Sequence, residues 1–445
     1  MAASTASRES SIPSIPASSH PSPTIHRLPN GLTIIAEQMP IEAVNLSIWL
    51  NMGSGVEPDS INGIAHFLEH MVFKGTPRIA CGEFERLIEE RGAITNAATS
   101  QDYTNYYITT APKDFAALAP LQIELVTNPT FDAEHFERER PVILEEIRRA
   151  EDNPQRRAFY RAMEMSFDRL PYRRPVLGPT SVIEKLSAEQ MKAFHHTWYQ
   201  PQNMTAVVVG NLPVEEMVRV IEEGFEAAFE RSDRTYAQPQ LIQQVPSKQP
   251  EAPFTTLRRN AYTDDALQQA RLLIGWRVPG MSELDKTYPL DVASSILSGG
   301  RTSRLINDLR EQRHLVNSIS ASNMSYGNQG VFYISAKVAP ENLEAAEEAI
   351  LHHIRQLHET PVTEAELTKI QTKVANRYVF GSETPSDRAG LYGYYNAMTG
   401  SIRHALDYPE HVRQVSAEAI QTAVQRYLPL EAYGVVTIQP SIENA

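Results

Sequence analysis

The feature that most constrains the fold of this 445-residue chain is an internal duplication. Trp49 and Trp276 each end an apolar segment, and they lie 276 − 49 = 227 positions apart. Three further pairs follow in the same order at offsets between 228 and 232: Asn128-Pro129-Thr130 with Thr360-Pro361-Val362, Leu186–Glu189 with Val415–Glu418, and Tyr199 with Tyr427. Solenoid repeats have periods of only about 20–50 residues, so this much longer period predicts two related halves.

Within each half, segments with the pattern of strands alternate with segments that have the pattern of helices. In the first half the expected helices are Glu83–Arg91, Pro112–Thr127, Ala133–Asp152, Ala188–Tyr199 and Val214–Ala228, and the expected strands are 32–37, 44–52, 94–99, 103–110 and 204–210. Asn30-Gly31 between two apolar segments indicates a hairpin turn. Strands paired by hairpins and covered by helices predict an α+β fold, with a mostly antiparallel sheet in each half.

Two polar stretches delimit these halves. Residues 1–23 contain eight Ser and four Pro and no apolar block, so we expect a disordered tail. An organellar transit peptide is the alternative, although Arg8 is its only arginine. Ser232–Pro253 holds four prolines and five glutamines and is expected to be a linker. The predicted domains are therefore 24–231 and 254–445.

Composition excludes several classes of function. The net charge of −13 disfavours nucleic acid as a partner, and the longest apolar runs are far short of the ~18 residues of a membrane span. The single cysteine, Cys81, cannot form an internal disulfide or a thiolate zinc site. A reducing compartment is therefore allowed, and we expect a bacterial cytoplasm, with an organelle as the alternative.

The pentapeptide His66-Phe67-Leu68-Glu69-His70 is the strongest chemical signal in the chain. It lies in an expected helix from Asn62, as N-cap, to about Phe73. Positions i and i+4 share a helix face, so His66 and His70 can bind one ion, and Glu69 flanks that face. The alternative is a helix with two ordinary histidines and a solvated glutamate.

A hydrolytic zinc site needs three protein ligands, so a third must come from a neighbouring element. The best donor is the expected helix Ala133–Asp152, in which Glu139 and Glu146 are seven residues apart and share a face. A solvated acidic surface is the alternative for this helix, because Glu134, Glu137 and Glu151 lie there too. Spacing alone leaves both possibilities open.

His66–His70, continued by Met71–Thr76, resembles the inverted zinc motif of the pitrilysin-type (M16, inverzincin) metallopeptidases. The resemblance covers the chain from Thr24 onward and implies the duplicated α/β-roll fold of M16 and LuxS-like metallohydrolases. It implies that Zn²⁺ is held by His66, His70 and Glu146, with Glu139 supporting the site and Glu69 as the general base. It also implies that the strand carrying Asn96 and Ala97 binds the backbone of a peptide substrate.

The resemblance extends to the second half. Family members that cleave use an arginine and a tyrosine seven residues apart to hold the substrate carbonyl, which implies Arg388 and Tyr395, with Tyr394 as a close substitute. A tyrosine-rich core segment is the alternative interpretation. The second half has no zinc motif of its own, because the shifted positions are Ala293, Ile296 and Leu297.

We therefore expect a zinc metalloendopeptidase that cleaves short unfolded peptides inside the chamber of a dimer. The resemblance implies that Arg388 and Tyr395 of one subunit complete the zinc site of the partner subunit. A homodimer is the simpler expectation, and a heterodimer with a metal-less family partner is the alternative. Two other functions remain: a non-catalytic assembly subunit like the bc1 core proteins, and an organellar presequence-processing peptidase. Processing peptidases carry acids where this chain has Arg156 and Tyr160, which counts against the latter. A zinc hydrolase for non-peptide substrates is disfavoured by the peptide-type strand.

Overall fold

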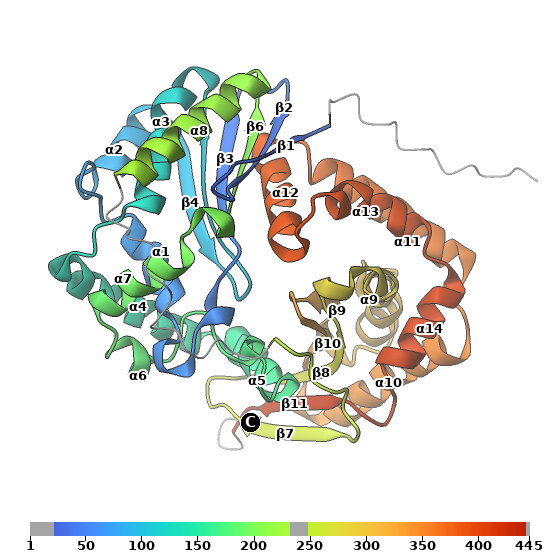
Figure 1. The fold of residues 1–445 in the computed structure, drawn as a ribbon. Helices are drawn as coiled ribbons and strands as arrows, with labels where there is room; N and C mark the ends of the chain where they lie inside the picture. The colour runs from blue at the N-terminus through green and yellow to red at the C-terminus, as the bar shows by residue number, and fades with distance from the viewer. Residues whose placement is uncertain (1–21, 232–247, 442–445) are drawn as a thin grey trace, which may run out of the picture.

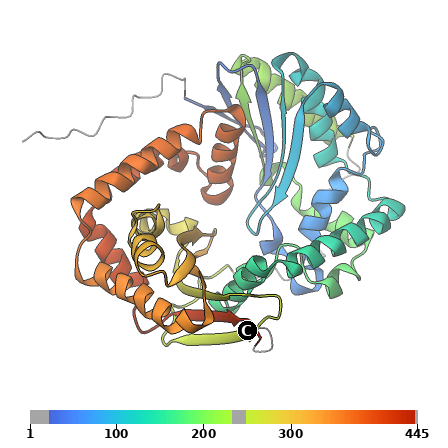
Figure 2. The same ribbon diagram turned by 180° about the vertical axis from the view of Figure 1, so that it is seen from behind.

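The computed structural model of the protein describes residues 22–231 and 248–441. Its elements form two sheets surrounded by helices (Figure 1 and, from behind, Figure 2). The predicted tail at 1–23 and most of the predicted linker at Ser232–Pro253 lie outside the described residues, so the domain boundaries stay predictions. Within the described ranges, no helix combines the length and the apolar character that crossing a bilayer requires.

The first sheet has the strand order β1-β2-β6-β3-β5-β4. Its β2–β6 pair is parallel, and its other described pairs are antiparallel. The turn at Asn30-Gly31 joins β1 to β2, with Gly31 at φ 93°, as the hairpin signal predicted. The strands are β1 (Thr24–Arg27), β2 (Thr33–Gln38), β3 (Val44–Leu50), β4 (Ile94–Thr99), β5 (Thr104–Thr110) and β6 (Met204–Gly210).

The second sheet repeats this topology, which confirms the prediction of an α+β fold with duplicated halves. Its order is β7-β11-β8-β10-β9, with β7 and β11 parallel and the other described pairs antiparallel. Without β1, the first sheet has the same order and the same parallel pair, so β4 and β9 are equivalent edge strands. The strands are β7 (Arg258–Thr263), β8 (Ala270–Pro279), β9 (Val316–Ser325), β10 (Gln329–Val338) and β11 (Gly434–Gln439).

Helices cover the sheets, and the five helices expected in the first half begin and end within two residues of the predicted positions. The helices of this half are α1 (Ile64–Val72), α2 (Glu83–Glu90), α3 (Pro112–Thr127), α4 (Ala133–Asp152), α5 (Pro154–Ser166), α6 (Thr180–Ile183), α7 (Ala188–Trp198) and α8 (Val214–Glu230). Those of the second half are α9 (Tyr288–Ser298), α10 (Leu343–Glu359), α11 (Glu364–Phe380), α12 (Pro385–Thr399), α13 (Arg403–Arg413) and α14 (Ala417–Tyr427).

Each half gives one helix to the sheet of the other half (Figure 1). Helix α12 of the second half lies on β3 and β6, where Ala389 and Tyr392 pack in one cluster with Trp49 and Val207. Helix α5 of the first half lies on β8 and β11, where its alanines and methionines pack in one cluster with apolar residues of the second sheet. The exchange explains why every residue of β3 and β6 is buried.

Close approach in the α12 contact depends on a glycine. A Cβ atom built on Gly393 would lie 2.0 Å from Nε1 of Trp49, a distance that no side chain tolerates. Gly390, one turn earlier in the same helix, has nothing within 4 Å of such a Cβ. The indole ring of Trp49 therefore packs directly on the backbone of α12.

Candidate metal centre

The helix that carries the motif begins at an internal carboxylate. Glu57 is fully buried, and its two carboxylate oxygens accept hydrogen bonds from the backbone N–H groups of Gly63 (2.8 Å) and Ala65 (2.8 Å). The prediction that Asn62 is the N-cap of α1 is wrong: the N-cap is Gly63, at φ 100°, and the amide of Asn62 donates to Glu57 at 2.7 Å. A side chain six residues before the N-cap thus satisfies free N–H groups at the helix start.

An aromatic contact fixes the distance between the two helices of the site. Phe67 of α1 and Phe136 of α4 are both buried, and their rings stack with centroids 4.6 Å apart. Ile143 and Ile147 of α4 belong to the same core cluster. This packing holds α1 and α4 side by side.

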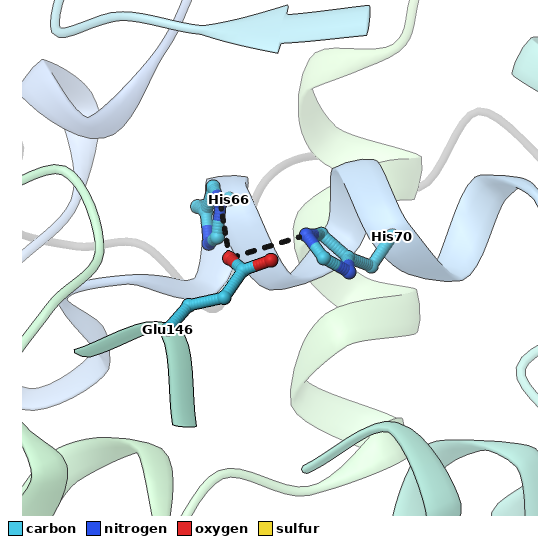
Figure 3. Close-up of side chains that lie close together, drawn as sticks. All are labelled: His66, His70 and Glu146. Carbon is cyan, nitrogen blue, oxygen red and sulfur yellow. Dashed lines mark ion pairs between the residues drawn. The ribbon is translucent and has the colours of Figure 1, made fainter. Parts of the chain in front are cut away.

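The same two helices, α1 and α4, bring together the three predicted metal ligands. Nε2 of His66 lies 3.5 Å from Oε2 of Glu146, and Nε2 of His70 lies 3.6 Å from the same oxygen, as Figure 3 shows. One ligand atom from each residue lies within 4.8 Å of the others. Two ligands of a tetrahedral zinc ion, with bonds of about 2.0–2.2 Å, are about 3.3–3.6 Å apart, so the cluster has the spacing of a zinc site.

Glu139 holds the second imidazole in place. Its Oε1 lies 2.9 Å from Nδ1 of His70, and its Oε2 lies 2.7 Å from Nζ of Lys74. Burial alone would raise the pKa of Glu139, but its hydrogen bonds with Lys74 and His70 outweigh this effect and lower it. A charged Glu139 keeps the proton of His70 on Nδ1, so that Nε2 presents its lone pair to the cluster.

The first imidazole is neutral over most of the pH range. Burial lowers the pKa of His66 to about 4, and the neighbouring His70 adds to this effect. Its Nδ1 is buried and has no hydrogen-bond partner among the described residues. Two imidazole nitrogens and one carboxylate oxygen form a donor set that suits Zn²⁺. The residues present therefore fit the metal.

Glu69 is connected to the edge strand of the first sheet. Its Oε2 accepts a hydrogen bond of 2.5 Å from the hydroxyl of Thr99, the last residue of β4. Burial raises the pKa of Glu69, and the hydrogen bond from Thr99 opposes this rise. The carboxyl is therefore less acidic than an exposed glutamate, which suits a group that accepts and returns a proton.

The predicted substrate strand is an edge strand of the sheet. β4 pairs with β5 on one side only, and its side chains alternate between exposed and half-buried. The backbone N–H of Ala97 is bound by Oδ1 of its neighbour Asn96, at 2.9 Å. The strand thus has a free edge close to Glu69.

Arg388 and Tyr395 do not join this cluster in the described chain. The guanidinium of Arg388 donates to Oε1 of Glu37 on β2 at 2.6 Å, and Tyr392 donates to the other oxygen at 2.7 Å. Arg388 also donates to the carbonyl of Ser382. Since Glu37 is only 2% exposed, this arginine neutralises a buried charge where α12 meets the first sheet.

The tyrosines predicted with Arg388 lie in aromatic packing. Tyr394 contacts the ring of Tyr103 edge-on at 5.9 Å, and Tyr395 contacts Tyr394 edge-on at 5.5 Å. Both line a cavity of the second half. Within the single chain these tyrosines contribute to aromatic packing, and their expected role at the zinc site of a partner subunit stays a prediction.

The second half carries no equivalent cluster. In α9, which follows β8 as α1 follows β3, the shifted positions Ala293, Ile296 and Leu297 are buried apolar side chains. Within residues 22–231 and 248–441, His66, His70 and Glu146 are the one group of His, Cys, Asp or Glu whose atoms lie close enough to hold a metal. One candidate centre per chain follows.

The chain has a duplicated α+β fold, and its first half carries a cluster of histidine and glutamate side chains. Together these two features are those of a class of peptidase-like proteins. Two family profiles match the chain: insulinase (peptidase family M16) over residues 32–180, and the peptidase M16 inactive domain over residues 185–374. The chain belongs to peptidase family M16.

Relatives and solved structures agree with this assignment. An uncharacterised zinc protease of Mycobacterium tuberculosis is 28% identical over 93% of this chain and 92% of its own length. The zinc protease PqqE of Helicobacter pylori is 25% identical over 93% of this chain and 92% of its own length. The crystal structure of a protease from Helicobacter pylori, 25% identical, covers 94% of this chain and 100% of its own with a TM-score of 0.85. A putative M16-like peptidase from Alicyclobacillus acidocaldarius, 22% identical, covers 94% of this chain and 98% of its own, and its TM-score of 0.81 shows the shared fold.

Proposed function

We propose that this protein is a zinc metalloendopeptidase that cleaves extended, unfolded peptides. The observation that carries the proposal is the convergence of His66, His70 and Glu146 within 4.8 Å of one another, with Glu69 on the same helix turn. A scaffold protein has no need to keep three neutral or anionic ligands and a buried carboxyl together.

Each side chain has a role in this proposal. His66, His70 and Glu146 would hold the zinc, and Glu139 would fix the ring of His70. Zinc, when bound, supplies a Lewis acid that lowers the pKa of water toward ~7 and polarises a carbonyl. Glu69, held by Thr99, would take the proton of the attacking water and pass it to the leaving amine.

The free edge of β4 supports a peptide as the substrate. A peptide that adds to this edge as a further strand would offer a backbone carbonyl to Ala97, in place of the amide oxygen of Asn96. Strand addition recognises the backbone of the peptide and depends little on its side chains, so we expect broad specificity. It also requires an extended substrate, which excludes folded proteins.

The surroundings of α5 argue against a presequence-processing peptidase. Arg156 and Tyr160, at the positions where processing peptidases carry acids, line a hollow of about 500 Å³ together with Gln101, which follows β4 closely. A guanidinium at this position would repel the arginine of a presequence. The general peptidase is therefore the better proposal of the two.

We also propose that the active protein is a dimer, on the basis of the family resemblance. Within the chain Arg388 is paired with the buried Glu37, so we do not assign it to the reaction. The relatives described above come from bacteria, which favours a bacterial cytoplasm as the location. Sedimentation of the zinc-loaded protein would measure the oligomeric state directly.

Zinc content and peptide cleavage together test the proposed function. The native protein is expected to contain about one zinc per chain and to cleave a library of fluorogenic peptides. Glu69→Gln is expected to keep the zinc and to lose at least about a hundredfold in rate, because the general base is removed. Glu89→Gln, an exposed glutamate of α2, is the matched control and should behave like the native protein.

The opposite result is equally informative. A native protein that binds no zinc and cleaves no peptide would refute the peptidase and favour the assembly subunit. A Glu69→Gln variant with undiminished cleavage would show that another group moves the proton.

A further inference from the structure

The second half has a cavity at the place where the first half carries the metal ligands. A volume of about 440 Å³ lies between α9, β9, α11, α12 and α13. By chain order and sheet topology, α9 corresponds to α1, β9 to β4, and α11 to α4. In the first half, α1 and α4 carry the metal ligands and the general base, and β4 carries the threonine that binds this base. The second half thus has a cavity beside the elements that correspond to the ligand-bearing elements of the first half.

The polar group in the wall of this cavity is an aspartate. Asp291 of α9 lines the cavity, and its Oδ1 accepts a hydrogen bond of 2.8 Å from the amide of Asn323 on β9. No ion pair joins Asp291 to any lysine, arginine or histidine of the described residues, although thirty such pairs occur there. Oδ1 of Asn323 is buried and also lacks a partner. The cavity therefore presents two oxygen atoms that could accept hydrogen bonds.

Aromatic rings form much of the remaining wall. Tyr394, Tyr395 and Tyr408 line the cavity, and Tyr288 supports Tyr408 edge-on with ring centroids 5.7 Å apart. Burial raises the pKa of all four hydroxyl groups, so these rings are neutral. Neutral tyrosine rings attract a cation to their faces, and the attraction grows when the cation is desolvated.

We propose that this cavity binds an organic cation, an ammonium or guanidinium group, with Asp291 as its counter-ion and the tyrosine rings as its walls. A volume of about 440 Å³ accommodates a small molecule or one long side chain. Arg377, the one arginine in the cavity wall, is exposed and makes no ion pair with Asp291 among the described contacts. Its positive charge opposes any cationic ligand, and this opposition is larger for a doubly charged group than for a singly charged one.

This binding site shares no residue with the metal centre, so cation binding can be measured separately from zinc binding and peptide cleavage. The cation could belong to a free amine or to the lysine or arginine side chain of a peptide. The probes separate these sources: n-butylammonium and n-butylguanidinium represent free cations, and N-acetyl-lysine methylamide represents a side chain within a peptide. n-Butanol and N-acetyl-norleucine methylamide are the matched neutral compounds.

Calorimetric titration of the full-length protein with these probes tests the proposal. We expect the cations to bind at least about tenfold more tightly than the neutral compounds, and Asp291→Asn to remove that preference. Asp285→Asn, an exposed aspartate before α9, removes the same charge and should leave binding unchanged. Tyr408→Phe keeps the ring and should retain binding, whereas Tyr408→Leu should weaken it.

Two outcomes would overturn the inference. Equal binding of butanol and butylammonium would show that the cavity recognises apolar groups only, and no binding of any cation at millimolar concentration would show that it is not a cation site. Circular dichroism of the variants separates loss of binding from loss of folding. A protein without zinc or cleavage should still bind the cation, so failure of the peptidase proposal leaves this inference standing.

Discussion

Replacement of Arg388 by methionine distinguishes the two roles that this residue could have. The guanidinium lies 2.6 Å from Oε1 of Glu37, a carboxylate that is 2% exposed. Arg388→Met leaves this carboxylate buried with only the hydroxyl of Tyr392 as a partner. Removal of one member of a buried ion pair costs about 3–5 kcal/mol, so we expect a loss of unfolding free energy in that range.

A second substitution should reverse much of this loss. Glu37→Gln combined with Arg388→Met leaves no unpaired charge, and we expect the double variant to recover at least about half of the lost free energy. Chemical denaturation followed by tryptophan fluorescence measures both, since Trp49 contacts α12 and reports on this interface. Arg355→Met, an exposed arginine of α10, is the control and should change stability little.

The outcome that would refute this reasoning is specific. If Arg388→Met were as stable as the native protein and kept its zinc, yet lost peptide cleavage, the arginine would act in the reaction, as the family resemblance implied. A double variant with recovered stability and recovered cleavage would establish the structural role.

Three further predictions follow from particular contacts. Gly393→Ala places a methyl group against the indole ring of Trp49 and should lower the unfolding free energy by about 1–3 kcal/mol. Gly390→Ala, in open space on the same helix, should stabilise the protein slightly. Thermal unfolding of the two variants measures the difference. Glu139→Gln should weaken zinc affinity by about 10–100-fold, measured by competition with a chelator, because the ring of His70 loses its anchor. Desolvation raises the pKa of Asp291 from 3.8 to about 7, so the folded chain binds this proton more tightly than the unfolded chain does. The resulting contribution to stability is complete below the pKa of the unfolded chain and is lost as pH rises to about 7. Asp291→Asn should therefore flatten the dependence of the unfolding free energy on pH in this range.

The sequence predicted the elements of the first half and the ligand cluster well, for physical reasons. Helices such as Ala133–Asp152 have long apolar periodicity, and their starts carry recognisable caps. The spacing of His66 and His70 is set by the helix itself, so their common face needs no tertiary information. Glu146 required the family resemblance, because nothing local says which glutamate of α4 faces α1.

Contacts between distant segments were missed. Glu57 acts as a cap from outside the helix, and its sequence neighbourhood gives no sign of this role. The pairing of Arg388 with Glu37 joins residues 351 positions apart, and no periodicity reports such a contact. Lys74 follows His70 by four residues, and both side chains bind Glu139 of α4.

The exchange of α5 and α12 has a consequence for the history of this architecture. A half-length chain with this topology would leave one sheet face bare unless a second copy supplied the missing helix. Two separate half-length chains could cover both sheets only by exchanging these helices as a dimer. Joining the two halves in one chain makes this helix exchange intramolecular. The second half can then cover the sheet of the first half without carrying metal ligands of its own.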